Sequence, residues 1–327
     1  MLELCVIVHR VELIRVSYAV PRFVSIIVVV GSSNTDLVVR LPHLPKPGET
    51  VTSLHFFKAL GGKGANQAVA AARLGADVTF VCRLGRDEYG QGCHRAYQAE
   101  GIDLQHAAWD DETPSGVCLI FVDERGENQI GYAPGANNRL SAADVKAAAS
   151  AIASADCLLT QLETPEDAAL QAARIARQHG VPVILNPAPT VPFSIALLDL
   201  VTVLTPNETE LEFILGQFAG ESSPSKALAA LAHRVPHLLV TLGAQGCRLL
   251  SAGQDSALPA FPVAALDTTA AGDAFNGGLA VALARGLPLP QAARFASAVG
   301  ALSVTRLGAQ PSLPTAAEVA AFLQEQS

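Results

Sequence analysis

The sequence has few charged residues, and it lacks the patterns that mark several classes of protein. Only 16% of its 327 residues are charged while 50% are hydrophobic, so the bulk of the chain cannot be disordered. The 22 basic residues form no run and are outnumbered by 30 acidic ones, for a net charge of −8, which argues against nucleic acid as a partner. No stretch of 18 uncharged apolar residues occurs, so we expect no transmembrane helix and no membrane partner.

The cysteines show no metal-binding or redox pattern. They are scattered along the chain without a CxxC motif or a Cys/His cluster. This distribution is typical of reduced, mostly buried thiols, so we expect a cytoplasmic protein without a structural zinc site. The six are Cys5, Cys82, Cys93, Cys118, Cys157 and Cys247.

The first 23 residues, MLELCVIVHRVELIRVSYAVPRF, differ from the rest of the chain. Charged residues interrupt their apolar stretches, so they lack the basic start and unbroken apolar run of a secretory signal. They could form an extra strand or helix, a frayed tail, or a stretch upstream of the true start of translation. We expect this extension to be peripheral and the functional domain to span residues 24–327.

From Val24 onward, short apolar runs alternate with alanine-rich helical runs, in a chain long enough for two domains or one large α/β domain. Near-continuous apolar runs are typical of strands covered on both faces. The strand candidates lie at 25–30, 78–82, 157–162, 182–186, 201–205 and 237–243. The clearest helical stretches are Ala65–Leu74, Ala142–Ala153, Glu166–His179 and Ser225–Arg234. We therefore predict an α/β fold with a mostly parallel central sheet and helices on both faces.

Two segments break the alternation. Residues 37–58 contain three prolines, which exclude a helix there. Residues 116–133 contain two apolar runs around an Asp-Glu-Arg-Gly turn, which predicts a hairpin. We predict that strands from about 37–58 and 106–133 form a small antiparallel β lid over the carboxyl edge of the main sheet, where ligands bind in such folds.

The segment GSSNTD, Gly31 to Asp36, directly follows the first strand candidate. We expect Asn34 and Asp36 to lie in the turn that leaves the sheet. A carboxylate two residues from an amide can hold adjacent hydroxyls of a polyol, since one accepts and the other donates. The same residues also suit an ordinary Asx turn, so this segment alone leaves both interpretations open.

The segment GGKGANQAVAAARLG, Gly61 to Gly75, joins a glycine-rich turn to a helix. Its glycines would let the backbone approach a ligand, and the free N–H groups of a helix starting at Asn66 could bind one. Lys63 is followed by Gly64 instead of Ser or Thr, so the segment is not a Walker A loop, and it does not match GxGxxG. A tight strand-to-helix junction is the alternative interpretation.

The segment LTPNETEL, Leu204 to Leu211, again follows an apolar strand candidate. Asn207, Glu208 and Glu210 place oxygen atoms in the first turn of a helix, which would suit a water-bridged Mg²⁺ that carries nucleotide phosphates. Asn is also a common helix cap, and acidic residues favour a first turn through the helix dipole, so this segment alone favours a purely structural role.

The segment LDTTAAGDAFNGGLAVAL, Leu266 to Leu283, carries the strongest functional pattern. A loop of small residues runs into a helix that starts near Asp273, and its backbone N–H groups would bind a phosphoryl group in transfer. Asp273 at the edge of that site could accept a proton from an attacking hydroxyl. Asp267 would lie outside it and could bind a cation. The small residues of the loop are Ala270, Ala271 and Gly272.

Taken in order, eight segments resemble the ribokinase (PfkB-type) family of sugar kinases, and the resemblance extends from Val24 to about Gln326. They are GSSNTD, GGKGANQAVAAARLG, QLETP, NPAP, TPNETE, VTLGAQG, DTTAAGDAFNG and VTRLGAQPS. The family pattern DTxGAGD has a glycine where this chain has Ala270, a replacement frequent among the ribokinases proper. GGKGANQA and VTRLGAQPS are closer to that subgroup than to the fructokinase or adenosine kinase relatives.

The resemblance implies a catalytic site and a sugar site. Asp273 matches the base that activates the 5-hydroxyl of the sugar, and the N–H groups of Ala270, Ala271, Gly272 and Asp273 match the anion hole. Besides Asp273, the positions that match sugar-binding residues are Asn34, Asp36, Gly62, Lys63, Asn66 and Glu163.

The resemblance also implies sites for nucleotide, Mg²⁺ and K⁺. Asn207 and Glu210 match the pair that coordinates Mg²⁺ and ATP. Together with Asn207, the nucleotide positions are Thr241, Gly243, Gly246, Gly272 and Ser297. Potassium would shape the anion hole without touching substrate. The loops of the potassium site, which bind the ion largely through carbonyl oxygens, match Asp267, Thr269, Ser303, Arg306, Gly308 and Ser312.

The implied activity is ATP-dependent phosphorylation of D-ribose at O5 by a homodimer joined through the lid strands. Two alternatives stay open. One is a kinase for another substrate, such as 2-deoxyribose, fructose or adenosine. The other is an inactive sugar-binding protein, which the presence of Asp273, Gly272, Asn207 and Glu210 disfavours. The pairing of Asn34 with Asp36 favours a furanose 2,3-diol over a 2-deoxy sugar.

Overall fold

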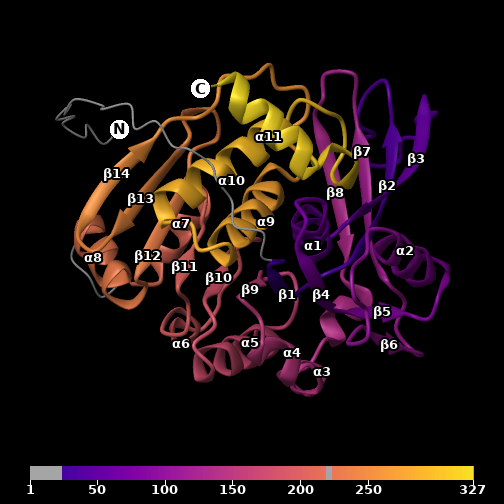
Figure 1. The fold of residues 1–327 in the computed structure, drawn as a ribbon. Helices are drawn as coiled ribbons and strands as arrows, with labels where there is room; N and C mark the ends of the chain where they lie inside the picture. The colour runs from indigo at the N-terminus through magenta and orange to yellow at the C-terminus, as the bar shows by residue number, and fades with distance from the viewer. Residues whose placement is uncertain (1–23, 219–222, 327) are drawn as a thin grey trace.

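The central feature of the structure is an eight-stranded sheet, in the order β14-β13-β12-β11-β10-β9-β1-β4 (Figure 1). The computed structural model describes residues 24–218 and 223–326, so the expectations for residues 1–23 lie outside the described residues. The strands of this sheet are β1 (Ile26–Val30), β4 (Asp77–Val81), β9 (Cys157–Thr160), β10 (Val183–Leu185), β11 (Val203–Leu204), β12 (His237–Thr241), β13 (Cys247–Ser251) and β14 (Gln254–Leu258).

Six neighbouring strands of this sheet run parallel, from β4 through β1, β9, β10 and β11 to β12. Only β13 and β14 continue it antiparallel. Helices link the parallel strands, as right-handed crossovers require. The predicted α/β fold with a mostly parallel sheet is therefore confirmed.

The apolar strand sequences are explained by two cores, one on each face of the sheet. Along β1, Ile27 and Val29 lie in one buried cluster while Val28 and Val30 lie in the other. Successive side chains of a strand point to opposite faces, so a strand covered on both faces must be apolar throughout.

The helices divide between the two faces. One core includes residues of α1, α2, α9, α10 and α11, and the other includes residues of the helices from α3 to α8. Their bounds are α1 (Lys63–Arg73), α2 (Glu88–Ala99), α3 (Ala142–Ala147), α4 (Ala149–Ala153), α5 (Glu166–Gln178), α6 (Ile195–Leu198), α7 (Glu208–Gly216), α8 (Pro224–Arg234), α9 (Ala271–Ala284), α10 (Leu289–Ser303) and α11 (Ala316–Glu325). The short 3₁₀ helices are η1 (Gly135–Arg139), η2 (Gly243–Gln245) and η3 (Gln310–Ser312).

Two expected elements differ in detail. The single helix expected over 142–153 is two short helices, because the backbone at Ala148 leaves the helical conformation with φ −93° and ψ 9°. The strand expected over 201–205 is reduced to Val203–Leu204, which still pairs with both of its neighbours.

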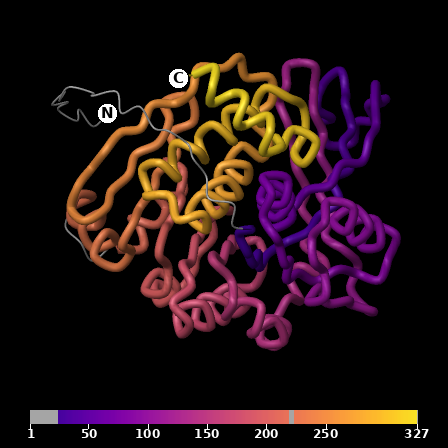
Figure 2. The backbone as a smooth tube through the Cα atoms, in the orientation of Figure 1, coloured from indigo at the N-terminus to yellow at the C-terminus, as the bar shows by residue number. Residues whose placement is uncertain are grey.

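A second sheet stands at one side of the molecule, opposite the side that carries β14 (Figure 2). It contains β3 (His55–Gly61), β2 (Asn34–Arg40), β7 (Gly116–Val122) and β8 (Asn128–Ala133), in that order. The outer pairs are antiparallel, while the middle pair, β2 with β7, is parallel. These strands correspond to the expected lid. Residues 106–115 do not join it, because β6 (Ala108–Asp110) pairs instead with β5 (Arg83–Gly85) in a separate two-stranded sheet.

Between residues 24–218 and 223–326, none of the helices has the length and apolar character needed to cross a bilayer. Five cysteines lie in the described part, all as free thiols, and only Cys118 among them is not fully buried. Within the same ranges no group of three His, Cys, Asp or Glu side chains is arranged to hold a metal ion.

Candidate active site

Polar residues follow neighbouring parallel strands at their carboxyl ends. Ser32 follows β1, Gln161 and Glu163 follow β9, Asn186 follows β10, and Asn207 follows β11. Because parallel strands end at the same edge, residues more than a hundred positions apart in sequence meet there. The Ser32 hydroxyl, for example, donates to Glu163 over 2.6 Å.

The sequence suggested that Asn34 and Asp36 lie in a turn, and this expectation was wrong. They belong to β2, where Asn34 pairs with both Gly61 and Gly116. The chain needs no Asx turn there, because the extended backbone is satisfied by two neighbouring strands. Residues two apart on a strand point to the same face, so Asn34 and Asp36 face the same side of the lid.

The side chains of Asn34 and Asp36 differ in how they are satisfied. The Asn34 side-chain oxygen accepts a 2.6 Å hydrogen bond from the Asn137 side-chain amide. The Asn34 side-chain nitrogen therefore lies near the Cys118 sulfur. One carboxylate oxygen of Asp36 is buried without any hydrogen-bond partner. Burial raises the pKa of Asp36 to about 6, with the Cys118 thiol opposing this shift and Glu163 adding to it. A buried acceptor without a partner is suited to a ligand hydroxyl.

Gly62 allows the loop before α1 to approach the start of β2. Its φ is 89°, in the region that favours glycine, and a Cβ there would lie 2.8 Å from the Asn34 backbone nitrogen. At the next residue, the Lys63 backbone N–H donates to Glu163 over 3.0 Å. The close approach therefore joins the first turn of α1 to the segment after β9.

Lys63 is surrounded by acidic groups. Burial lowers the pKa of its amine, but attraction from Asp273, Glu163 and Glu210 outweighs burial, so the pKa lies above its ordinary value. The ammonium group is therefore charged at neutral pH. It is the positive charge that offsets three carboxylates at this edge of the sheet.

Asp273 lies in the first turn of α9, almost fully buried. One carboxylate oxygen accepts a 2.8 Å hydrogen bond from the Asn66 amide, and the other accepts a 2.9 Å bond from the Gln67 amide. Burial raises the pKa of Asp273, while Lys63 and the two amides favour the ionised form. Ala270 caps the helix with φ 60°, a left-handed conformation that costs an alanine about 1 kcal/mol and a glycine almost nothing.

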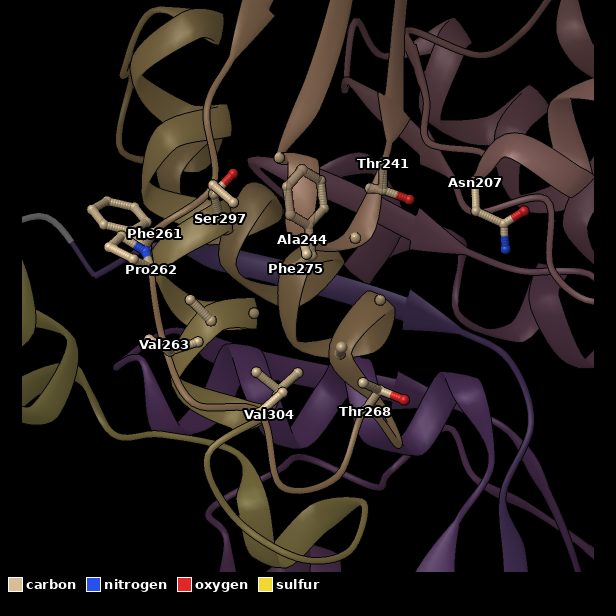
Figure 3. A pocket seen from close by; sticks show the side chains of 18 of the residues that line it. Asn207, Thr241, Ala244, Phe261, Pro262, Val263, Thr268, Phe275, Ser297 and Val304 are labelled. Atoms are coloured by element: carbon tan, nitrogen blue, oxygen red, sulfur yellow. The ribbon is translucent and has the colours of Figure 1, made fainter. Parts of the chain in front are cut away.

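A pocket of about 530 Å³ opens beside the N-terminus of α9. In Figure 3, Asn207 lies at one end of it and Phe261 with Pro262 at the other. The polar and glycine residues of its lining include all those expected at the nucleotide site, namely Asn207, Thr241, Gly243, Gly246, Gly272 and Ser297. Apolar side chains such as Phe261, Val263 and Val304 make the rest of the lining suited to the flat face of a base.

Asn207 and Glu210 form a reciprocal cap at the start of α7. The Asn207 side-chain oxygen accepts from the Glu210 N–H over 2.8 Å, and the Glu210 carboxylate accepts from the Asn207 N–H over 2.9 Å. Burial raises the pKa of Glu210, and Lys63 opposes that shift. The helix-capping role considered from the sequence is thus present. The second carboxylate oxygen of Glu210 is not used by the cap and is a hard ligand suited to Mg²⁺.

The segments around Asp267 and Gly308 meet through one carboxylate. One Asp267 oxygen accepts from the N–H and hydroxyl of Thr269, and the other accepts from the Gly308 N–H over 2.8 Å. These bonds hold the pKa of Asp267 below its ordinary value despite partial burial. The Arg306 guanidinium pairs with Glu318 over 2.6 Å, so from this residue only the backbone carbonyl suits a cation. Ser303 and Ser312 are fully buried, and each donates its hydroxyl to a nearby backbone carbonyl.

Several residues of the site were not predicted from the sequence. Gln67 contacts Asp273, Asn137 contacts Asn34, and Cys118 lies beside Asp36. Gln67 lies within the GGKGANQ segment, where its position one residue after Asn66 was the available signal. Nothing local distinguishes Asn137, because it reaches Asn34 only when the lid folds.

The fold and this site define a phosphotransferase of the α/β class, with a nucleotide-sized pocket and a buried carboxylate at one helix N-terminus. The family model for pfkB family carbohydrate kinases matches residues 25–316. The chain belongs to this family.

Similar proteins cover almost the whole chain. It is 45% identical over 298 residues to a ribokinase from Haemophilus influenzae, and the matched region covers 90% of this chain and 97% of that one. The crystal structure of a Thermotoga maritima ribokinase matches with a TM-score of 0.83 and 38% identity, over 92% of this chain and all of that one. An Arabidopsis thaliana ribokinase complexed with ribose and ATP matches with a TM-score of 0.83 and 34% identity, over 92% of this chain and 99% of that one.

Proposed function

We propose that the chain is an ATP-dependent ribokinase that phosphorylates D-ribose at O5. The observation that carries the assignment is the position of the α9 N-terminus. Ala271 and Gly272 line the nucleotide-sized pocket, while the next residue, Asp273, bonds to Asn66 and Gln67 of α1 on the other side. One helix end thus separates the two substrates and presents both anion-binding N–H groups and a base.

The reaction follows from this arrangement. Asp273 accepts the proton of the ribose 5-hydroxyl as O5 attacks the γ-phosphorus of ATP, the bond to the β–γ bridging oxygen breaks, and ADP leaves. The N–H groups of Ala270, Ala271 and Gly272 would bind the charge of the transferred group, once the Ala271 N–H turns from the Thr268 carbonyl that it contacts over 3.2 Å. Positioning supplies most of the rate, since the protein forms no covalent bond itself.

The sugar would lie between the lid and α1. Asp36 offers a carboxylate to two adjacent hydroxyls, and Asn34 offers an amide N–H because its oxygen is already bonded to Asn137. Glu163 and the unpartnered side-chain oxygen of Asn66 supply further acceptors. Gly62 and Lys63 complete the site through the turn before α1. A 2-deoxy sugar would leave the buried Asp36 with one fewer partner, which favours ribose.

Asn207 and Glu210 would hold Mg²⁺ with the nucleotide phosphates, and the remaining pocket residues would surround the nucleotide. Mg²⁺ would neutralise phosphate charge. The carbonyl-rich loops joined by Asp267 would hold K⁺, which supports the shape of the anion hole from behind. The residues of those loops are Asp267, Thr269, Ser303, Arg306, Gly308 and Ser312.

We also propose a homodimer formed through the lid, in the cytoplasm, where the free thiols stay reduced. The outer face of the lid supports dimerisation, since Phe56 and Leu119 are exposed there.

The assignment is tested by ADP release with Mg·ATP across ribose, 2-deoxyribose, fructose and adenosine, with and without K⁺. Ribose-selective turnover that rises with K⁺ is the expected result. Preference for another substrate would refute the interpretation of Asn34 and Asp36 but not the base. Ribose binding without any turnover would favour an inactive sugar-binding protein.

Asp273→Asn should lower kcat by several orders of magnitude while ribose and ATP still bind, because the amide cannot take the proton. Turnover is measured by ADP release and binding by calorimetry. Asp199→Asn is the matched control, since Asp199 is an exposed partner of Arg234 outside the site. Near-normal turnover of Asp273→Asn would contradict the role of Asp273 as base.

A further inference from the structure

Three neighbouring strands of the main sheet end in buried polar residues that the proposed reaction does not use. Gln161 follows β9, Asn186 follows β10 and Thr205 follows β11. All three are at least nine-tenths buried, and so is Gln67 on α1. Buried polar groups are costly unless they are bonded, so their partners indicate what they do.

The hydrogen bonds of these amides have a fixed direction. The Gln161 amide nitrogen donates to the Gln67 side-chain oxygen over 2.6 Å. Because that oxygen is occupied as an acceptor, the Gln67 nitrogen must face the other way. It donates to Asp273 over 2.9 Å and to the Asn186 oxygen over 3.1 Å. A flipped Gln67 would place its oxygen against the Asp273 carboxylate and lose all three bonds.

The same network continues to the backbone of α9. The Asn186 amide donates to the Thr205 carbonyl, and the Thr205 hydroxyl donates to the Asn276 oxygen over 2.6 Å. The Asn276 amide then donates to the Gly272 carbonyl over 2.8 Å. The ends of three strands thus hold both the Asp273 carboxylate and the first turn of the helix that carries it.

Four groups face Asp273 from the elements packed against it. Lys63, Asn66 and Gln67 come from α1 and favour the ionised carboxylate. Burial is the main factor against ionisation, and Glu163, from the segment after β9, adds a smaller repulsion. The Gln67 amide donates to one carboxylate oxygen of Asp273, and the Asn66 amide donates to the other.

We propose that Gln67, oriented by Gln161 and Asn186, is the positioning residue that holds the Asp273 carboxylate ionised and aimed at the sugar hydroxyl. The proposal rests on the proposed function and deepens it. Gln67 itself touches neither substrate. It acts by fixing the rotation of the carboxylate and by stabilising its charge.

The first test is Gln67→Met, which keeps the volume and removes the donor. We expect kcat for ribose to fall about 10- to 100-fold, the range for losing a hydrogen bond to a charged group, while KM for ribose changes less than about threefold. The bond favours ionised Asp273, so its loss should move the acidic limb of the kcat–pH profile to higher pH. Gln67→Glu keeps the shape and adds a negative charge, so the limb should move further.

The second test is a double-mutant cycle with Gln161→Met, which frees Gln67 to rotate. Gln161→Met should show a smaller upward shift of the limb. The double variant Gln67→Met/Gln161→Met should lose no more activity than Gln67→Met alone, because Gln161 acts through Gln67. Ser115→Ala is the control, since it removes a partly buried 2.7 Å bond to the carboxylate of Asp87 outside this network. It should lower stability and leave the pH profile unchanged.

An unmoved acidic limb in folded Gln67→Met and Gln67→Glu would overturn the proposal, and so would additive losses in the cycle. Either result would leave ribokinase activity standing in the unaltered chain. Absence of ribose turnover in the unaltered chain would instead refute the proposed function.

Discussion

In the protein without ligand, the carboxylate of Asp36 is buried and also lacks one hydrogen-bond partner that would stabilise its charge. Its carboxylate is largely buried in the lid, and one oxygen has no hydrogen-bond partner. Burial raises the pKa of Asp36 to about 6. Binding of a diol would supply the missing partners, so sugar binding and ionisation of Asp36 should be coupled.

Ribose binding should therefore weaken as the pH falls through 6. Below that pH Asp36 is protonated and accepts fewer hydroxyl hydrogens, so the Kd for ribose should rise about tenfold for each further pH unit. Calorimetric titrations between pH 5 and 8 measure this dependence. In Asp36→Asn, the Kd should be high at every pH, and a Kd in the unaltered protein that stays flat over this range would contradict the coupling.

The same variant should have the opposite effect on stability. A raised pKa means that the native state binds the proton more tightly than the unfolded chain does, so Asp36 favours folding at low pH. That advantage is lost as the pH rises from the ordinary value of 3.8 through about 6. Without ligand, Asp36→Asn should be more stable than the unaltered protein at pH 8, by up to about 3 kcal/mol, and by only about half as much at pH 5. Denaturant unfolding at the two pH values tests this difference.

At the scale of elements, the site depends on how closely α1 and α9 approach each other. Gly277 on α9 faces α1, where an added Cβ would lie 2.6 Å from the Ala70 Cβ and 2.9 Å from the Gln67 carbonyl oxygen. No side chain fits in that space without moving a helix. The contact brings Asn66 and Gln67 within hydrogen-bond distance of Asp273.

Gly277→Ala should therefore damage catalysis more than binding. Separating the helices lengthens the bonds to Asp273, so kcat should fall at least tenfold, while overpacking should cost about 1–3 kcal/mol of stability. Kinetics with ribose and thermal unfolding measure the two effects.

Gly92→Ala is the matched control for this change. Gly92 lies inside α2, and an added Cβ there meets nothing within 4 Å. The substitution should stabilise the protein by up to about 1 kcal/mol through helix propensity, with unchanged kcat. If Gly277→Ala behaved in the same way, close packing of α1 against α9 would not matter for the site.

The elements were predictable from the sequence where one local signal dominates. Apolar runs identified the parallel strands, and the prolines of residues 37–58 excluded a helix between β2 and β3. The first turn of α9 was also predictable, because small residues followed by Asp273 form a local pattern. The hydrogen-bond network that holds the Asp273 carboxylate was not predictable. Gln67, Gln161 and Asn186 are neutral amides whose function exists only after three strand ends and a helix meet.

At the scale of the whole molecule, the candidate site uses most of the chain. Residues near 34, 63, 163, 207 and 273 meet along one edge of the sheet, so no part of the chain holds a complete site. The lid is the exception to this compact arrangement, since it stands at one side of the molecule (Figures 1 and 2). One of its faces carries Asp36 and Cys118, on the side of the proposed sugar site.

The opposite face of the lid is mostly apolar, although Lys58 of β3 pairs with Leu37 there. The register of the sheet places several apolar side chains on it, five of them toward its outer end, and Phe56 and Leu119 are 58% and 49% exposed. The five are Leu37, Val39, Phe56, Leu119 and Phe121. Exposed apolar side chains grouped in this way are typical of a protein interface, and two copies of one sheet can cover each other.

Charge on that face should therefore separate the proposed dimer. Phe56→Glu and Leu119→Glu each place a carboxylate opposite its symmetry mate or against apolar side chains, so the mass measured by light scattering should halve. Leu307→Glu is the control, because Leu307 is 57% exposed and lies outside the lid. The separated protein should bind ribose less tightly, since the lid that carries Asp36 would lose its support. An unchanged mass in both lid variants, or a monomeric unaltered protein, would contradict dimerisation through the lid.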